Sequence, residues 1–380
     1  ANEWFSHHRK GGGDLGWPDY SRPMLRRFRT WLRQRYADDV EALRESWKNA
    51  EVAFDSVEIP SVEDRLQYRD ENFFYTATAL GNRVADYYIC YDETLAELGV
   101  AWCTAIKEAS NRKKLAGMMH AYSYCGRHDA ALVPHHHGHG MGMITLRSPD
   151  VDFVHSPYHY YNRSFGGTHF SQHAPDTVLA CGKLMIDQID SKSHLRLRSM
   201  NARTPWETEQ LFKRDAAYSV TKNMHCYWLE GGPGDMFPIV PHSPKEYGRM
   251  WNDDPEIRRI IARLKTWTDD NHRLAAKPAA EVALITSNEG LFYRKPERVF
   301  GNLFVEAFRQ WMMGEIGAPF DDYIQEDFPN IRRRYKAYFF MDPHYMTGAL
   351  RKAVTAKLEA DGATALWFYA PGFVDERGPS

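Results

Sequence analysis

The chain has 380 residues, of which 48 are Lys or Arg and 50 are Asp or Glu, so its formal net charge at pH 7 is −2. This balance argues against partners that are held by a basic surface, namely nucleic acid and anionic membranes. The length suits two domains, or one large barrel with an appendage. Aromatic residues make up 14% of the chain, and rings with polar edges are surfaces on which sugars stack.

The cysteines and the N-terminus bear on the cellular compartment. Five scattered cysteines show no metal-ligand spacing, and an odd number argues against a disulfide framework; they are Cys90, Cys103, Cys125, Cys181 and Cys226. No apolar run of about 18 residues occurs, and residues 1–20 lack the layout of a signal peptide. We therefore expect a soluble protein and favour the cytoplasm. The sequence begins abruptly and without Met, so an upstream segment is expected and localisation stays open.

Helices dominate the first hundred residues. Ser21-Arg22-Pro23 opens an amphipathic helix, in which apolar residues recur at helical spacing at Met24, Leu25, Phe28, Trp31 and Leu32. A short helix from Asp39 to Trp47 follows. A long helical region is predicted from about Val62 to Lys113.

From Leu115 onward, short apolar runs alternate with polar loops and helices. Four runs read as buried strands, namely 115–122, 151–155, 182–186 and 224–228. Thr204-Pro205 predicts a helix start between the last two, with Thr204 as N-cap and Glu207 completing a capping box. Repeated strand, loop and helix, with polar residues after each strand, predict a (β/α) barrel whose site lies at the carboxyl ends of the strands. We place this domain at residues 1–275.

A second α/β domain is predicted over residues 279–380. Apolar runs at 281–287, 335–340 and 364–369 read as strands, and residues 300–313 and 346–360 read as helices. Alternation of this kind predicts a doubly wound parallel sheet.

Polar and aromatic residues at three places could carry chemistry. Asn2-Glu3 suits a retaining glycoside hydrolase, because a Glu can protonate the leaving oxygen while an Asn binds the 2-hydroxyl; a solvated surface position is the alternative. Residues Asp187, Gln188, Asp190 and His194 crowd together after the third strand, as either a polar site or an ordinary loop. The loop that holds Tyr160 and Arg163 could line a sugar pocket, or it could pack on its own tyrosines.

Two further features leave alternatives open. Trp228 could form the floor under a sugar ring, or it could plug the barrel. Residues 134–139, Pro-His-His-His-Gly-His, suggest a metal site, but adjacent histidines rarely converge on one ion and no zinc spacing is present. We therefore expect neither a metal nor a cofactor.

Taken in order, several of these segments resemble glycoside hydrolase family 42, the β-galactosidases, and their relatives. The resemblance rests on Asn2-Glu3, Phe28 to Tyr36, Leu43 to Trp47, Ser148 to Phe153, Ser156 to Gly167, Gly182 to Leu184, Thr204 to Arg214, Trp228, and Tyr335 to Gly372. It implies a (β/α)8 barrel followed by an amidotransferase-like domain that helps to build a trimer. It also implies an oligosaccharide substrate and a retaining mechanism.

Carried over residue by residue, Glu3 matches the acid/base after the fourth barrel strand, and position 188 matches the nucleophile after the seventh. Relatives have Glu in a Glu-x-Asp-x-Arg-x-His pattern there, whereas this chain has Gln188, with Asp190, Lys192 and His194 following. A neutral amide cannot attack the anomeric carbon. Two explanations of Gln188 are open. The first, which we favour, is an engineered exchange of Glu for Gln. The second is a natural departure, in which Asp187 acts as the nucleophile instead or hydrolysis has been lost.

The resemblance accounts for barrel strands four to eight, so we predict that an upstream segment or another chain supplies the first three. We interpret the chain as a retaining β-glycosidase that acts on β-galactosides, with Asn2, Tyr160, Arg163, Asp187, Asp190, His194 and Trp228 as substrate contacts. The alternatives are an inactive carbohydrate-binding relative and a β-glycosidase of another sugar specificity.

Overall fold

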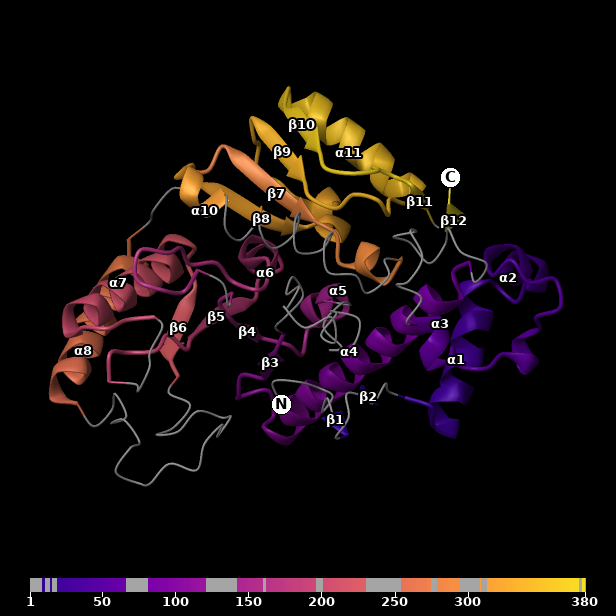
Figure 1. Cartoon of the computed structure of the whole chain (residues 1–380), viewed down its shortest axis with the longest axis horizontal. Helices are drawn as coiled ribbons and strands as arrows, with labels where there is room; N and C mark the ends of the chain where they lie inside the picture. Colours follow the sequence, from indigo (N-terminus) through magenta and orange to yellow (C-terminus); the bar gives the residue numbers. More distant parts are fainter. Residues whose placement is uncertain are drawn as a thin grey trace.

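The computed structural model describes residues 9–10, 14–15, 19–65, 81–120, 142–159, 162–195, 201–229, 254–274, 279–293, 308, 313–375 and 378–379. All structural statements below concern these residues. The helices and strands keep the labels of Figure 1.

A helical region precedes the sheets, as predicted. It contains α1 (Arg22–Arg35), α2 (Val40–Ser46), the 3-10 turn η1 (Phe54–Ser56), α3 (Val62–Arg65) and the long α4 (Arg83–Ala109). Ser21 Oγ accepts a hydrogen bond from the Met24 amide (3.2 Å), and Asp39 caps α2 in the same way. Phe28 and Leu32 on the apolar face of α1 are fully buried in the core that α1 shares with α2 and α4. Capping and periodicity therefore explain these helices.

Four parallel strands form the first sheet, in the order β3-β4-β5-β6. They are β3 (Gly117–Met119), β4 (Phe153–Pro157), β5 (Leu184–Ile189) and β6 (His225–Trp228). All four predicted strands are confirmed. Their boundaries differ by up to three residues. The difference that matters most is at β5, which runs on to Ile189 and so includes Asp187 and Gln188, both predicted to follow the strand.

Three helices pack against this sheet, namely α5 (Gly142–Arg147), α6 (Pro175–Ala180) and α7 (Pro205–Thr221), and α8 (Pro255–His272) packs against α7. The start of α7 is the predicted one, since Thr204 Oγ1 accepts a hydrogen bond from the Glu207 amide (3.1 Å). The Glu207 carboxylate accepts from the Arg203 amide rather than from Thr204 as a capping box requires. The α/β class is confirmed. Within the described residues β3 and β6 each pair on one side only, so these residues do not test the predicted closure into an eight-stranded barrel.

A second parallel sheet has the order β10-β9-β7-β8. Its strands are β7 (Val282–Thr286), β8 (Phe320–Ile324), β9 (Ala337–Phe340) and β10 (Thr364–Trp367), accompanied by η5 (Glu289–Tyr293), α10 (Met313–Ile316), η7 (Gln325–Asn330) and α11 (Gly348–Asp361). The sequence analysis predicted three of these strands and missed β8. Two acidic residues interrupt the apolar run of β8, and acidic residues are depleted in strands; Asp321 is buried there because Lys222 and Arg333 compensate its charge.

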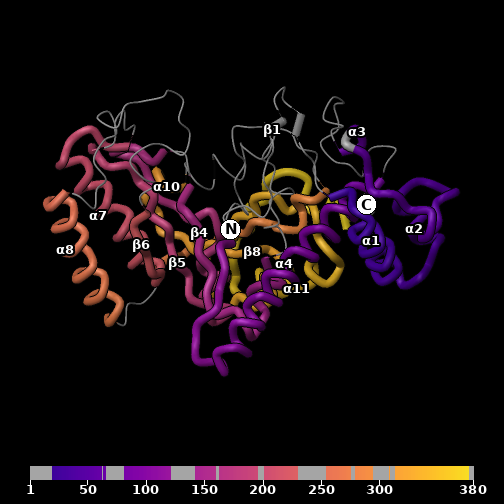
Figure 2. Tube along the Cα trace, turned by 90° about the horizontal axis from the view of Figure 1, so that it is seen from below, coloured from indigo at the N-terminus to yellow at the C-terminus, as the bar shows by residue number. Residues whose placement is uncertain are grey.

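Lys222, at the end of α7, ties the two sheets together. Its Nζ lies 2.9 Å from Asp176 of α6 and 3.1 Å from Asp321 of β8. Figures 1 and 2 show α7 and α8 at one end of the molecule and α1 and α2 at the other, with the strands of the first sheet between them. Two short antiparallel pairs complete the structure, β1 (Arg9–Lys10) with β2 (Asp14–Leu15) and β11 (Val374–Asp375) with β12 (Gly378–Pro379). Among the described helices, none has the length and apolar character that crossing a membrane requires.

Candidate active site

Gln188 lies at the carboxyl end of β5 and is 4% exposed. In the parallel register it is paired with Pro157 of β4 and Tyr227 of β6, so the three side chains share one face of the sheet. The Tyr227 hydroxyl donates a hydrogen bond to Gln188 Oε1 (2.6 Å) and lies 3.4 Å from His155 Nδ1. We call this side of the sheet, with Gln188, Tyr227 and His155, the open face, since Tyr227 remains 36% exposed.

Both titratable neighbours of Gln188 are held in their neutral forms. Burial raises the pKa of Tyr227, and the charges of Asp190 and Asp187 raise it further. Burial lowers the pKa of His155. At neutral pH the side chains of Gln188, Tyr227 and His155, an amide, a phenol and an imidazole, can therefore all form hydrogen bonds and carry no charge themselves.

Asp187 points to the opposite side of the sheet, because successive side chains of a strand alternate. It is fully buried. Its Oδ2 lies 2.6 Å from His169 Nε2 and accepts a hydrogen bond from Ser219 of α7 (3.1 Å). We call this side, toward α6 and α7, the packed face. Asp187 is thus directed away from the face that carries Gln188.

His169 is clamped between two aspartates on the packed face. Its Nδ1 lies 2.9 Å from Asp215 Oδ1, and its ring stacks on Tyr158 with 4.2 Å between centroids. Burial opposes the charged imidazole, but Asp187 and Asp215 outweigh it and raise the pKa of His169. Burial also acts to raise the pKa of Asp215, yet His169, Arg214 and Ser191 outweigh it and lower that pKa.

Arg163 and Asp190 form a buried ion pair beyond the strand ends, with 2.6 Å between Nη1 and Oδ1. The Arg163 guanidinium also donates to the carbonyl oxygens of His159 and Tyr158 (2.6 Å each). Both residues were predicted to contact substrate. Their contacts here hold together the segments that follow β4 and β5.

His194 and Trp228 lie apart from Gln188 in their contacts. The Thr208 hydroxyl lies 2.9 Å from both the His194 amide and its Nδ1. Trp228 follows Tyr227 on β6 and so shares the packed face with Ile189; it packs against Phe212 of α7, with centroids 6.1 Å apart. Of the two alternatives for Trp228, these contacts favour a packing role.

Several predicted features fall outside the described residues. They are Asn2, Glu3, Tyr160, Cys125 and the histidine-rich run at 134–139. Within the part of the chain that is described, no three His, Cys, Asp or Glu side chains are grouped so that they could share a metal ion.

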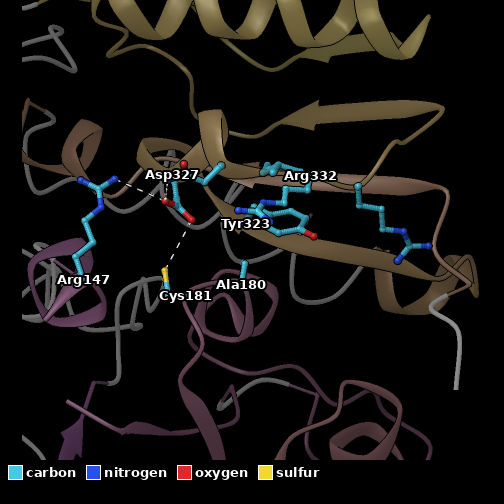
Figure 3. Close-up of a pocket in the computed structure, with 9 residues that line it drawn as sticks. Arg147, Ala180, Cys181, Tyr323, Asp327 and Arg332 are labelled. Carbon is cyan, nitrogen blue, oxygen red and sulfur yellow. Dashed lines mark hydrogen bonds and ion pairs between the residues drawn. The ribbon is translucent and has the colours of Figure 1, made fainter. Parts of the chain in front are cut away.

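A cavity of about 540 Å³ opens between α5 and α6 on one side and β8 and η7 of the second sheet on the other (Figure 3). Arg147 reaches Asp327 there across 3.6 Å, and the Cys181 thiol lies 3.9 Å from the same carboxylate. None of the predicted site residues lines this cavity. It therefore does not belong to the open face.

The sequence did not point to four residues that contact the predicted site residues, namely Tyr227 and His155 on the open face and His169 and Asp215 on the packed face. Tyr227 had a usable signal. Side chains alternate between the two faces of a strand, so Tyr227 and Trp228 must lie on opposite faces of β6, and one of them must share the face of residue 188 on the neighbouring parallel strand. His169 and Asp215 gave no local signal, since the contact between them spans 46 residues of sequence.

No family model and no curated protein matches this chain. Among solved structures, it is similar to a cold-adapted β-galactosidase from a Rahnella species, with a TM-score of 0.62 and 14% identity over 96% of this chain and 51% of that one. A catalytic mutant of a family 42 β-galactosidase from G. stearothermophilus gives 0.62 and 14% over 97% and 52%. A family 42 exo-carrageenase from Bacteroides ovatus gives 0.61 and 12% over 95% and 47%.

The chain thus spans about half the length of these structures. At such low identity the likeness establishes the fold. The chain therefore has, over nearly its whole length, the fold of one half of the glycoside hydrolase family 42 proteins, as its sequence motifs had suggested.

Proposed function

We propose that this chain carries the site-bearing half of a retaining β-glycosidase of the β-galactosidase kind, in which residue 188 occupies the position of the nucleophile. One observation carries the proposal. Residue 188 lies near the carboxyl end of the parallel strand β5, on the open face, and the Tyr227 hydroxyl donates a hydrogen bond to its side-chain oxygen at 2.6 Å. The fold shared with β-galactosidases supports the reaction class.

Retaining hydrolysis needs an ionised carboxylate at that position and a second carboxyl group about 5–5.5 Å away as acid/base. We assign the second role to Glu3, with Asn2 at the sugar 2-hydroxyl. Gln188 is isosteric with Glu but offers a neutral oxygen, so the chain with Gln188 binds substrate without forming a glycosyl-enzyme. The phenol of Tyr227 would donate to a carboxylate at the same place, which favours its ionised form.

Asp187 is not a substitute nucleophile in this proposal. Its carboxylate lies on the packed face and is committed to His169 and Ser219. The second candidate function is a carbohydrate-binding relative that has lost hydrolysis, and Gln188 itself favours it. The two candidates differ in one expected result: a carboxylate at position 188 restores turnover only in the first.

A test compares the protein with its Gln188→Glu variant on a panel of aryl β-glycosides, beside calorimetry with galactosides. Binding without turnover is expected for the unchanged protein, and a gain in kcat of at least about a thousandfold for Gln188→Glu. Gln34→Glu, an exposed position on α1, makes the same charge change and should give no gain. If galactosides bind but Gln188→Glu gives no gain in kcat, the chain is the inactive carbohydrate-binding relative. If galactosides do not bind and kcat does not rise, both candidate functions are refuted.

The remainder of the barrel is a further part of the proposal. Edge strands β3 and β6 each pair on one side only within the described residues, and unpaired edges of parallel sheets are normally covered. On α4, Leu98, Trp102 and Ile106 form an exposed apolar stripe at four-residue spacing. We propose that further β/α units cover the edge strands and this stripe. We also propose that residues 279–380 form an amidotransferase-like domain and that the protein assembles into a trimer. Intact mass and light scattering of the natural protein test this; a stable monomer of this length alone would contradict it.

A further inference from the structure

On the packed face, the contacts of one histidine restrict where its protons are. A neutral imidazole carries one N–H and one lone pair, whereas an ionised carboxylate only accepts hydrogen bonds. His169 contacts carboxylate oxygens through both ring nitrogens, at 2.6 Å and 2.9 Å. Both contacts are attractive only if the imidazole carries two protons, or if one aspartate carries a proton.

The surroundings of Asp215 favour its ionised form. Arg214 forms an ion pair with its Oδ1 (2.7 Å), and the Ser191 hydroxyl donates to its Oδ2. A carboxylate that accepts hydrogen bonds from a guanidinium and a hydroxyl is strongly held in its ionised form. The remaining question is whether the other proton sits on His169 or on Asp187.

The aromatic surroundings favour the imidazolium. Tyr158 stacks on the His169 ring with only 4° between the planes, and Tyr218 of α7 lies 4.7 Å away between centroids; electron-rich ring faces attract a cation. The titratable and charged groups around His169 are Asp187 from β5, Asp215, Arg214 and Tyr218 from α7, Tyr158 after β4, and Cys226 of β6 beyond Asp187. With His169 and Arg214 charged, two cations balance the two aspartates.

We infer that His169 is a buried imidazolium that neutralises Asp187 directly behind residue 188, and is thereby a positioning residue for the proposed nucleophile. The functional half of this inference rests on the proposed function. Asp187 and residue 188 are consecutive on β5, so an uncompensated Asp187 would disfavour a second negative charge at position 188. The imidazolium removes that repulsion and fixes the strand end through both of its N–H groups.

The protonation state is tested on the unchanged protein by nitrogen-15 NMR of labelled histidine, with His169→Gln identifying the signal. We expect both ring nitrogens of His169 to be protonated at pH 7. An unprotonated Nε2 at pH 7 would place the proton on Asp187 and overturn the inference. This arm does not depend on catalysis.

The positioning role is tested in the Gln188→Glu protein by the pH profile of kcat/KM for an aryl β-galactoside. His169→Gln should shift the acidic limb upward by about one pH unit or more, and adding Asp187→Asn should return it, because the uncompensated charge is then gone. His272→Gln, a histidine on α8 outside the network, should leave the limb in place. An unmoved limb in a folded His169→Gln variant would contradict the role.

If His169→Gln alone fails to fold, the His169→Gln/Asp187→Asn pair remains informative, since recovery of folding by the second exchange reports the same compensation. Failure of both to fold would contradict it. Absence of turnover in Gln188→Glu itself would instead refute the proposed function and leave the NMR result standing.

Discussion

The two faces of the first sheet differ in how their polar groups are satisfied. On the packed face, every charged member of the Asp187–His169–Asp215–Arg214 chain has an opposite charge within 3 Å. On the open face, Gln188 has one short hydrogen bond, and Tyr227 is more than one third exposed. Consecutive residues of one strand therefore differ in role: Asp187 is committed to a buried ion-pair network, and residue 188 is the one we propose for ligand contact.

Removing Asp215 should break the packed face most severely. Asp215→Ala removes the carboxylate partner of Arg214 and leaves His169 with Asp187 alone, and breaking a buried pair from one side costs about 3–5 kcal/mol of unfolding free energy. Urea unfolding measures this cost. A loss below about 1 kcal/mol would show that the clamp contributes little.

Two neighbouring aromatics on β6 offer a matched pair. Trp228→Ala on the packed face should lower the unfolding free energy by about 2–3 kcal/mol and leave galactoside affinity unchanged. Tyr227→Ala on the open face should cost less stability and weaken the affinity roughly tenfold. The opposite ranking in both measurements would make Trp228 the sugar platform that the sequence also allowed.

The titration of His169 and Asp215 on the packed face should make the free energy of unfolding depend on pH. The pKa of His169 is raised above 6.5 in the folded chain, so its contribution is complete below pH 6.5 and is lost as the pH rises through the folded value. The pKa of Asp215 is lowered below 3.8, so its contribution is present above that pH and is lost as the pH falls through the folded value. Relative to His169→Gln/Asp215→Asn, the protein should be most stabilised between about pH 4 and 6.5. A difference that rises steadily from pH 4 to 9 would contradict this assignment.

The smallest expected effect concerns the cap of α7, which supports the packed face from its edge. Thr204→Ala removes the acceptor of the Glu207 amide and should cost about 1 kcal/mol. Thr221→Ala, at the other end of the helix, serves as a control in thermal unfolding and should cost less. Equal losses would mean that the cap is not a specific contribution.

Local patterns predicted most of the fold. Apolar runs and capping residues predicted α1, α2, α7 and all strands of the first sheet, because each of these signals lies within a few residues of sequence. They failed at β8, where Asp321 is tolerated only because Lys222, about a hundred residues earlier, lies beside it. A compensating charge at that distance leaves no local trace.

The residues of the candidate site were harder to predict from the sequence than the helices and strands. Position 188 came from the order of motifs, and the structure places it at a strand end beside Tyr227. Asp187 could not be separated from Gln188 in the sequence, because their difference arises only when β5 alternates between two faces. The clamp on His169 joins β5, α7 and the segment after β4, and only the tertiary fold brings these together.

The central claim is that residue 188 stands in the position of the nucleophile, and a covalent trap tests it most directly. The Gln188→Glu protein is treated with a 2-deoxy-2-fluoro-galactoside that carries a good leaving group, because fluorine slows release of the glycosyl-enzyme; digestion and mass spectrometry then locate the label. Our account predicts labelling of the peptide that contains residue 188, and none in the unchanged protein. Turnover with the label on another carboxylate, or labelling of the protein that retains Gln188, would contradict it.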